Sequence, residues 1–270
     1  MSFSFDHLVF FSKKPEVAVP LLKQRGIHTV NGGRHQFWGT YNSLTYFGLS
    51  YIEFLGIENL PMAEKQEENR LITHIVEQLA GKMQEGPARI AIRTDHIHQL
   101  AVRLKEAGFT VYGPITGERT RADGQVIKWT TLYPETEDSE LALPFFIQWE
   151  KSDGERLIEL EEQGLIESHL AGKLQFESVV FVVHNLEQTL AAWRSLFDLN
   201  QGEEFVDSSL NARCRELELA GTRLVFCTPL GAGIADTVLN EKGETPFLVN
   251  LTGNGQSEIF EMMNGFWRFQ

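Results

Sequence analysis

Apolar and polar positions follow the same order twice along the first half of the chain. Residues 5–56 and residues 88–150 each open with a short apolar run and continue with apolar positions at helical spacing. Each segment then closes on apolar runs separated by turn residues. The helical stretch ends at Gly26 in the first segment and at Gly108 in the second. The pattern predicts two copies of a strand–helix–three-strand unit.

A third, weaker copy begins near residue 177, with an apolar run at 178–183 and a helix over 186–199. Strands are expected at 214–219, 223–227 and 247–251, and a short terminal helix at 257–263. Residues 64–82 and 152–173 read as linking helices, the second followed by a loop. The predicted fold class is α+β, built from repeated βαβββ modules with a third, partial module at the C-terminus.

We expect a first domain over residues 1–150, with modules at about 3–58 and 86–150 joined by a helix. Residues 151–270 are then a linker and the degenerate third module. The chain has 270 residues, for which length alone favours roughly two domains.

Charge and composition narrow the class of partner. The formal net charge of -13 repels phosphate backbones, which argues against nucleic acid. No basic leader precedes an apolar run, and no apolar run is long enough to span a bilayer, so we expect a cytoplasmic protein that binds no membrane. Cys214 and Cys227 lack the spacing of a metal site and read as reduced thiols.

His7 and Glu53 form the first candidate site. They lie on the first and last predicted strands of the first copy, and Glu53 lies on the opposite strand face to its apolar neighbours Ile52 and Phe54. If these strands belong to one curved sheet, both side chains project from its concave face. Imidazole and carboxylate are ligands for a divalent metal and are also an acid–base pair. The alternative is a hydrogen-bonded buried histidine and an exposed glutamate.

The second copy departs from this pair. Aligning Gly26 with Gly108 places Arg89 opposite His7. Matching the closing apolar runs at 51–54 and 146–149 places Gln148 opposite Glu53. An arginine and an amide are poor metal ligands, so this half of the site favours an anionic ligand held by Arg89.

Two loop segments add candidate substrate contacts. Residues 32–42 are rich in glycine and polar side chains, and His35 and Asn42 are expected at a pocket rim; the alternative is a loop that caps its own backbone. Arg121 precedes a predicted turn and could bind a carboxylate or phosphate, while the Trp129 ring could form an apolar wall of the pocket. The alternative is an exposed hairpin with an ordinary core tryptophan. The common nucleotide, hydrolase and zincin motifs do not occur.

The repeated unit with His7 and Glu53 on its outer strands resembles the vicinal oxygen chelate superfamily, which includes glyoxalases, bleomycin-resistance proteins and extradiol dioxygenases. The polar pattern of residues 33–42 and the pattern from Arg121 to Trp129 look like its glyoxalase-like subfamily. The resemblance extends over residues 5–149. It implies paired modules that form a curved-sheet cleft, with metal ligands on the first and last strand of each module.

Carried over residue by residue, the resemblance makes His7 and Glu53 the metal ligands or the catalytic acid and base. The substrate would be held by a second set: His35, Asn42, Arg89, Arg121, Trp129 and Gln148. The implied protein is a lyase, isomerase or dioxygenase that acts on a small oxygenated or anionic substrate with one divalent metal ion.

Because Arg89 and Gln148 replace two ligands, a metal-free protein that binds and sequesters a small molecule stays open. An interaction module is a third alternative. In that case the third copy would mediate a homodimer.

Overall fold

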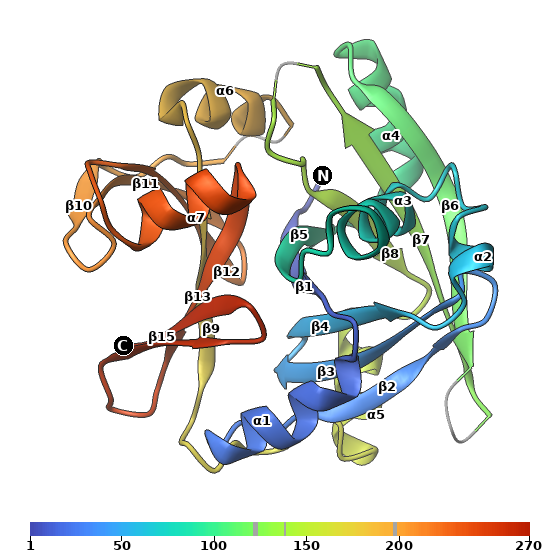
Figure 1. Ribbon diagram of the computed structural model, residues 1–270. Helices are drawn as coiled ribbons and strands as arrows, with labels where there is room; N and C mark the ends of the chain where they lie inside the picture. Colours follow the sequence, from blue (N-terminus) through green and yellow to red (C-terminus); the bar gives the residue numbers. More distant parts are fainter. Residues whose placement is uncertain (121–123, 138, 197–198) are drawn as a thin grey trace.

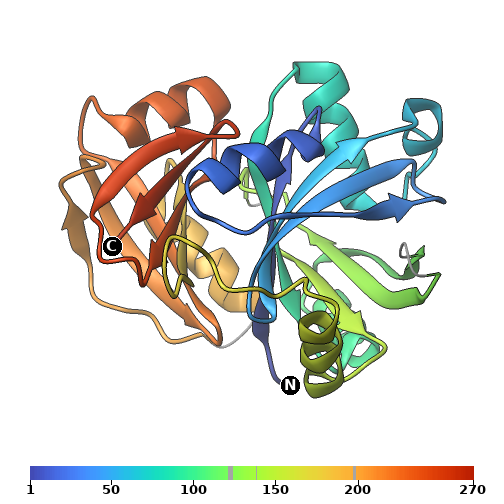
Figure 2. The same ribbon diagram turned by 90° about the horizontal axis from the view of Figure 1, so that it is seen from below.

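Eight strands formed by residues 4–149 close into a barrel, and the later strands form a curved sheet beside it (Figures 1 and 2). The computed structural model describes residues 1–120, 124–137, 139–196 and 199–270. The barrel strands are β1 (Ser4–Phe11), β2 (Val30–His35), β3 (Thr40–Phe47), β4 (Ser50–Ile57), β5 (Gly86–Arg93), β6 (Thr110–Thr120), β7 (Val126–Glu135) and β8 (Phe145–Trp149). Around the barrel their order is β1-β4-β3-β2-β6-β7-β8-β5.

Each half of the barrel is one strand–helix–three-strand unit, as the repeat predicts. In the first unit β1 pairs with β4 in parallel, and in the second β5 pairs with β8 in parallel. The units meet where β1 and β5 pair antiparallel, with His7 opposite Ala91 and Val9 opposite Arg89. If the two copies are related by a local twofold axis and His7 corresponds to Arg89, then Val9 corresponds to Ala91. The pair His7–Ala91 then has the pair Arg89–Val9 as its symmetry mate, as observed. The alignment of the helix-ending glycines therefore has the correct register for the first strands.

The helices of the barrel lie on its outside and at one end. Ala18 and Leu22 of the first helix pack against outward-facing residues of β1, whereas Ile72 and Ile75 of a linking helix pack against residues inside the barrel. The linking helix therefore covers one end of the barrel interior. The helical segments of this half are η1 (Pro15–Val17), α1 (Ala18–Gln24), α2 (Leu60–Ala63), α3 (Arg70–Val76), the π-helical η2 (Glu77–Lys82), α4 (Ile97–Glu106) and α5 (Asp153–Glu162).

The C-terminal sheet contains a third strand–helix–three-strand unit and part of a fourth. Its strand order is β10-β11-β12-β9-β13-β15-β14. β9 pairs with β12 in parallel and with β13 antiparallel, as β1 does with β4 and β5. The partial fourth unit consists of a first strand, β13, and a final hairpin, β14–β15. The remaining elements are β9 (Gln175–Val182), α6 (Leu186–Leu196), β10 (Phe205–Asp207), β11 (Ala212–Leu219), β12 (Thr222–Pro229), α7 (Ile234–Lys242), β13 (Thr245–Thr252), β14 (Glu258–Met262) and β15 (Gly265–Phe269).

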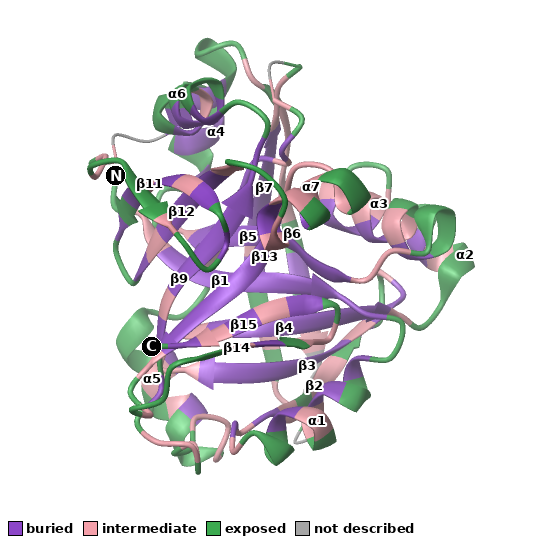
Figure 3. Ribbon diagram, turned by 60° about the vertical axis from the view of Figure 1, so that its left-hand side comes forward, coloured by how far each residue is buried: buried purple, intermediate pink, exposed green. Residues whose placement is uncertain are grey.

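One apolar core joins the barrel to the C-terminal sheet. It contains residues from both halves, including Phe10 of β1 and Trp267 of β15, whose ring centroids are 5.6 Å apart. Figure 3 shows buried residues along the strands of both sheets, while the helices are exposed on their outer sides. Gly265 has no room for a side chain, because an added Cβ would lie 2.7 Å from the Phe10 ring. The close approach of β15 to β1 therefore depends on glycine.

Two predicted helices differ in the structure. The terminal helix expected at 257–263 is the hairpin β14–β15, in which Met263 and Asn264 adopt left-handed φ angles of 55° and 58°. Two consecutive left-handed residues make a tight hairpin turn, which a helix does not contain. The single linking helix expected over 64–82 is divided, because the Asn69 side chain accepts a hydrogen bond from Ile72 N and starts α3 anew.

Candidate functional site

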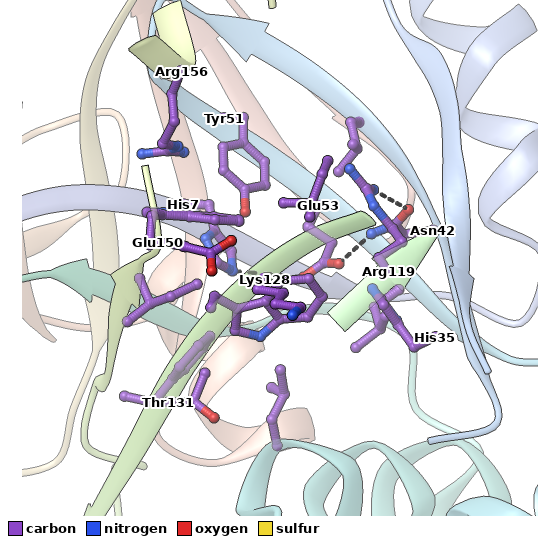
Figure 4. Close-up of a pocket in the computed structure, with 18 of the residues that line it drawn as sticks. His7, His35, Asn42, Tyr51, Glu53, Arg119, Lys128, Thr131, Glu150 and Arg156 are labelled. Carbon is purple, nitrogen blue, oxygen red and sulfur yellow. Dashed lines mark hydrogen bonds and ion pairs between the residues drawn. The ribbon is translucent and has the colours of Figure 1, made fainter. Parts of the chain in front are cut away.

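A pocket opens into the barrel interior and encloses about 1040 Å³, including the part open to solvent. Side chains from both barrel units and from α5 line it, and Figure 4 shows Arg156 of α5 beside His7 and Tyr51. Five of the residues singled out from the sequence line this pocket together: His7, His35, Asn42, Glu53 and Trp129.

His7 and Glu53 face one another inside the pocket, with 3.6 Å between His7 Nε2 and Glu53 Oε2. On its other side His7 Nδ1 lies 2.7 Å from Asp6 Oδ1. Neighbouring side chains on a regular strand point to opposite faces, but the register of β1 against β5 shifts between Phe5 and His7. This β-bulge lets Asp6 and His7 meet. The imidazole also stacks on the Tyr51 ring, with 4.5 Å between centroids.

Asp6 is fully buried, and its environment keeps it ionised. Burial by itself would raise the pKa of this carboxyl, but the hydrogen bond from His7 and the charges of Arg156 and Arg93 outweigh burial and hold the pKa far below its usual range. Arg93 and Trp149 donate to Asp6 Oδ2 over 3.1 Å and 2.9 Å. An ionised carboxylate only accepts hydrogen bonds, so His7 Nδ1 carries the proton. In the neutral ring the Nε2 lone pair is then directed at the pocket.

Glu53 is held by a chain of polar contacts. Asn42 Nδ2 donates to Glu53 Oε1 over 2.5 Å, and Asn42 Oδ1 accepts from Gly33 N and from Arg119 Nη1. The neighbouring Gly32 allows this arrangement, because a Cβ there would lie 2.0 Å from Asn42 Oδ1. The glycine-rich segment thus serves to bring its backbone against Asn42, and Asn42 fixes the orientation of Glu53 (Figure 4).

His35 is a neutral side chain of the pocket wall. Its Nδ1 lies 2.9 Å from Thr40 Oγ1. Burial, with a smaller effect of the Arg119 charge, lowers the pKa of His35 to about 3. Its ring packs against Trp38 and Trp129 at centroid distances of 5.6 Å and 5.9 Å. These rings give the pocket a large apolar surface.

The helix α5 brings residues to the pocket that the sequence did not single out. The Arg156 guanidinium carbon lies 4.1 Å from the centroid of the Trp149 ring. Arg156 Nη1 lies 3.7 Å from Asp6 Oδ2. Ser152 caps this helix in a capping box with Glu155. A charged residue in an otherwise apolar strand could have marked Asp6, but Arg156 belongs to a charged stretch with no distinguishing pattern.

Gln148 does not lie at the position expected for it. Val9 pairs with Glu53, and its counterpart Ala91 pairs with Phe145, so Phe145 is the true counterpart of Glu53. The match of the closing runs was three residues out of register, and an odd shift exchanges the two faces of a strand. Gln148 Oε1 instead accepts a hydrogen bond from Ile97 N at the start of α4.

Arg89 does not line this first pocket. Arg89 lines a second cavity, and its guanidinium lies 5.7 Å from the ring centroid of Tyr133, which belongs to the wall of the first pocket. Arg89 is therefore not a neighbour of His7 and Glu53 in one site. Arg121 lies outside the described residues, whereas Arg119 lines the first pocket.

The residues present do not fit a tightly bound divalent metal ion. His7 Nε2 and Glu53 Oε2 are two donors, whereas the matching positions of the second unit hold Arg89 and Phe145, a cation and a hydrocarbon. Within the described part of the chain, no three His, Cys, Asp or Glu side chains are grouped to hold a metal. Metal sites in proteins ordinarily use three or four such donors.

Comparison with known proteins gives one family match and several structural matches. The family model described as a glyoxalase-like domain matches residues 5–197. No curated protein sequence matches the chain. A hypothetical protein from Staphylococcus aureus superimposes with a TM-score of 0.80 over 99% of both chains, at 24% identity. A mutant 4-hydroxymandelate synthase from Streptomyces coelicolor superimposes with a TM-score of 0.57 at 11% identity, over 93% of this chain and 71% of its own.

Proposed function

The chain belongs to the glyoxalase-like domain family, and from this starting point we propose that its barrel pocket catalyses proton transfer on a small carbonyl compound that carries an anionic group. The reaction class is isomerisation or elimination, which begins with removal of a proton from the carbon next to a carbonyl. The observation that carries the proposal is the position of His7, held by the ionised Asp6 on one side and facing Glu53 in the pocket on the other.

The surroundings of His7 suit a general base. Asp6 fixes the tautomer, so that Nε2 can accept a proton from a substrate in the pocket. Once protonated, the imidazolium would lie between two carboxylates, Asp6 at 2.7 Å and Glu53 at 3.6 Å, which stabilise its charge. His7 then returns the proton to a neighbouring carbon in an isomerisation, or to the leaving group in an elimination.

Two arginines support the choice of an anionic substrate. Arg119 and Arg156 line the pocket, and guanidinium groups bind carboxylates through paired N–H donors. The same groups would stabilise the negative oxygen that develops when the carbonyl compound loses its proton. The rings of Trp38, Trp129 and Trp149 favour a flat or apolar remainder of the substrate.

The first prediction is tested by hydrogen–deuterium exchange. Wild-type protein is incubated with pyruvate or phenylpyruvate in D₂O, and proton NMR follows loss of the signal from the carbon next to the carbonyl. We expect accelerated exchange, reduced roughly 100-fold or more by His7→Gln, which removes the proton acceptor, and by Glu53→Gln, which removes a carboxylate that stabilises the protonated ring. His98→Gln, at an exposed position on α4, is the matched control and keeps wild-type exchange.

Exchange that persists in both His7→Gln and Glu53→Gln would show that these residues are not the acid–base pair. A second candidate function, sequestration of a small molecule without reaction, is favoured by the aromatic wall around His35. Binding of phenylpyruvate by calorimetry without accelerated exchange would support sequestration and contradict catalysis of this reaction. Metal analysis of the purified protein addresses the divalent ion implied by the family resemblance.

A further inference from the structure

A second cavity, distinct from the first pocket, encloses about 650 Å³, including the part open to solvent. Its charged and polar lining includes Arg70, His74, Glu77, Arg89 and Glu135. None of the roles proposed for His7 and Glu53 involves this cavity. It has three properties of a built binding site.

The first property is a buried cation without a carboxylate partner. The exposed fraction of Arg89 is 4%, and its Nε donates to the backbone oxygen of Leu143 over 2.6 Å. Within the described residues no Asp or Glu forms an ion pair with Arg89. Burial lowers the pKa of this guanidinium to about 10, so it is charged at neutral pH. A buried charge is usually paired, so the remaining donors of Arg89 suit an anion from outside the chain.

The second property is a buried donor without an acceptor. His74 Nε2 lies 3.3 Å from the amide nitrogen of Gln78, which can only donate, so His74 Nε2 accepts and Nδ1 carries the proton. Burial, together with the positive charge of Arg89, lowers the pKa of His74 to about 3, and the ring is neutral. His74 Nδ1 has no hydrogen-bond partner among the described residues. Unsatisfied buried donors are rare in folded proteins.

The third property is the charge balance, which sets the kind of anion. Arg70 is already paired with Glu135 at 2.6 Å, and Glu77 adds a further negative charge to the lining. The two arginines and two glutamates of the lining sum to zero, and among the described residues Arg89 is the cation of this lining without a carboxylate at ion-pair distance, which favours a ligand with one negative charge over two. Leu141 and Leu143 contribute apolar surface beside it.

We propose that this second cavity binds the carboxylate group of a small organic acid, with one oxygen accepting from the Arg89 guanidinium and the other from His74 Nδ1. The inference does not depend on proton transfer in the first pocket. Because the Arg89 guanidinium lies 5.7 Å from the ring centroid of Tyr133, which lines the first pocket, such a ligand would lie near the wall of that pocket.

Isothermal titration calorimetry with butyrate, butyramide and inorganic phosphate tests the proposal as the second prediction. Butyrate is expected to bind the second cavity of the wild-type protein more tightly than the neutral butyramide and the more highly charged phosphate do. Arg89→Met removes the charge while keeping a long side chain, and we expect it to weaken butyrate binding by roughly tenfold or more. Arg194→Gln, which removes the same charge from the exposed face of α6, retains wild-type affinity.

Two further variants keep the test decisive. His74→Phe keeps an aromatic ring that can pack edge-on against Phe11 but removes Nδ1, so we expect it also to weaken butyrate binding. If Arg89→Met does not fold, this variant still tests whether butyrate binds in the second cavity. Arg119→Gln removes a cation from the first pocket and so weakens any butyrate binding there, while the binding that depends on Arg89 and His74 remains. The proposal is overturned if butyrate does not bind, if phosphate binds more tightly, or if Arg119→Gln rather than Arg89→Met or His74→Phe abolishes binding.

Discussion

Single buried polar residues determine the chemistry of the barrel interior. Asp6 is one carboxylate that accepts from an imidazole, a guanidinium and an indole at once. Such a fully satisfied buried network fixes the orientation of each member. His7 and Glu53 could be selected from the sequence because a histidine and a glutamate interrupt apolar strands. Asp6 also interrupts an apolar strand, but its contact with His7 depends on a β-bulge, and the contact of Arg156 with Asp6 depends on the docking of α5, neither of which the sequence reveals.

The neutral state of His35 gives a prediction about pH. Its folded pKa of about 3 lies below the ordinary histidine pKa of 6.5, so near pH 5 the unfolded chain binds a proton that the folded protein does not. Stability therefore falls as the pH decreases below about 6.5, and the loss ends near the folded pKa. Between pH 7 and pH 5 this one group should cost about 2 kcal/mol of unfolding free energy.

Urea unfolding of wild-type protein and His35→Asn at pH 7 and pH 5 measures this effect. The variant should lose less stability than the wild type by about that amount, because it has no imidazole to protonate. His98→Gln is the control, since His98 is exposed and contacts solvent in both states. An identical pH dependence for His35→Asn and wild type would contradict the assignment of a neutral, buried His35.

At the scale of elements, the strand–helix–three-strand order and the α+β class were predictable from the sequence, because apolar periodicity and helix-ending glycines report directly on local structure. The register of β8 was not. The runs 51–54 and 146–149 have the same order of apolar and polar residues. The strand pairing, however, places Glu53 beside Val9 and Phe145 beside Ala91, so Glu53 and Phe145 are the equivalent positions. Pairing is a non-local property, so similar residues in two copies do not guarantee equivalent positions.

The capping of α5 leads to a prediction at this scale. Ser152→Ala removes the side chain that accepts from Glu155 N and should destabilise the helix by about 1 kcal/mol. Because α5 holds Arg156 and Leu160 against the pocket, we expect severalfold weaker binding of phenylpyruvate. Calorimetry measures the affinity, and amide hydrogen exchange measures the opening of α5. Ser257→Ala, at an exposed loop position, is the control. Faster exchange in α5 with unchanged affinity would show that the helix does not contribute to binding.

At the scale of the molecule, the barrel and the C-terminal sheet are joined by packing and by the backbone. Phe5 N donates to the backbone oxygen of Ala220 over 2.8 Å, and the Phe5 ring stacks on Phe176 at 4.8 Å. Within the described residues, no helix has the length and apolarity needed to cross a membrane. The domain boundary near residue 150, the homodimer and the cytoplasmic location stay predictions.

The shared core predicts that both halves unfold together. Trp267→Ala removes a fully buried ring that contacts Phe10 of the barrel, and we expect it to cost about 3–5 kcal/mol. Scanning calorimetry should give a single transition for wild type and variant, shifted to lower temperature in the variant. Phe37→Ala, at a side chain that is 66% exposed, is the control. Two separate transitions, of which only one responds to Trp267→Ala, would show that the halves are independent.

The closure of the barrel has a consequence for assembly by strand addition. The barrel closes between β2 and β6 through one described residue pair, Arg34 with Thr120, so most of these two strands is not paired across the closure. The C-terminal sheet is open at both ends, where β10 and β14 offer backbone groups to a strand of another chain. Both ends carry features that discourage such pairing: β10 has three residues, and β14 carries Glu258 and Glu261. Loss of these two acidic side chains would therefore make strand addition at β14 easier and favour aggregation or domain swapping through this edge.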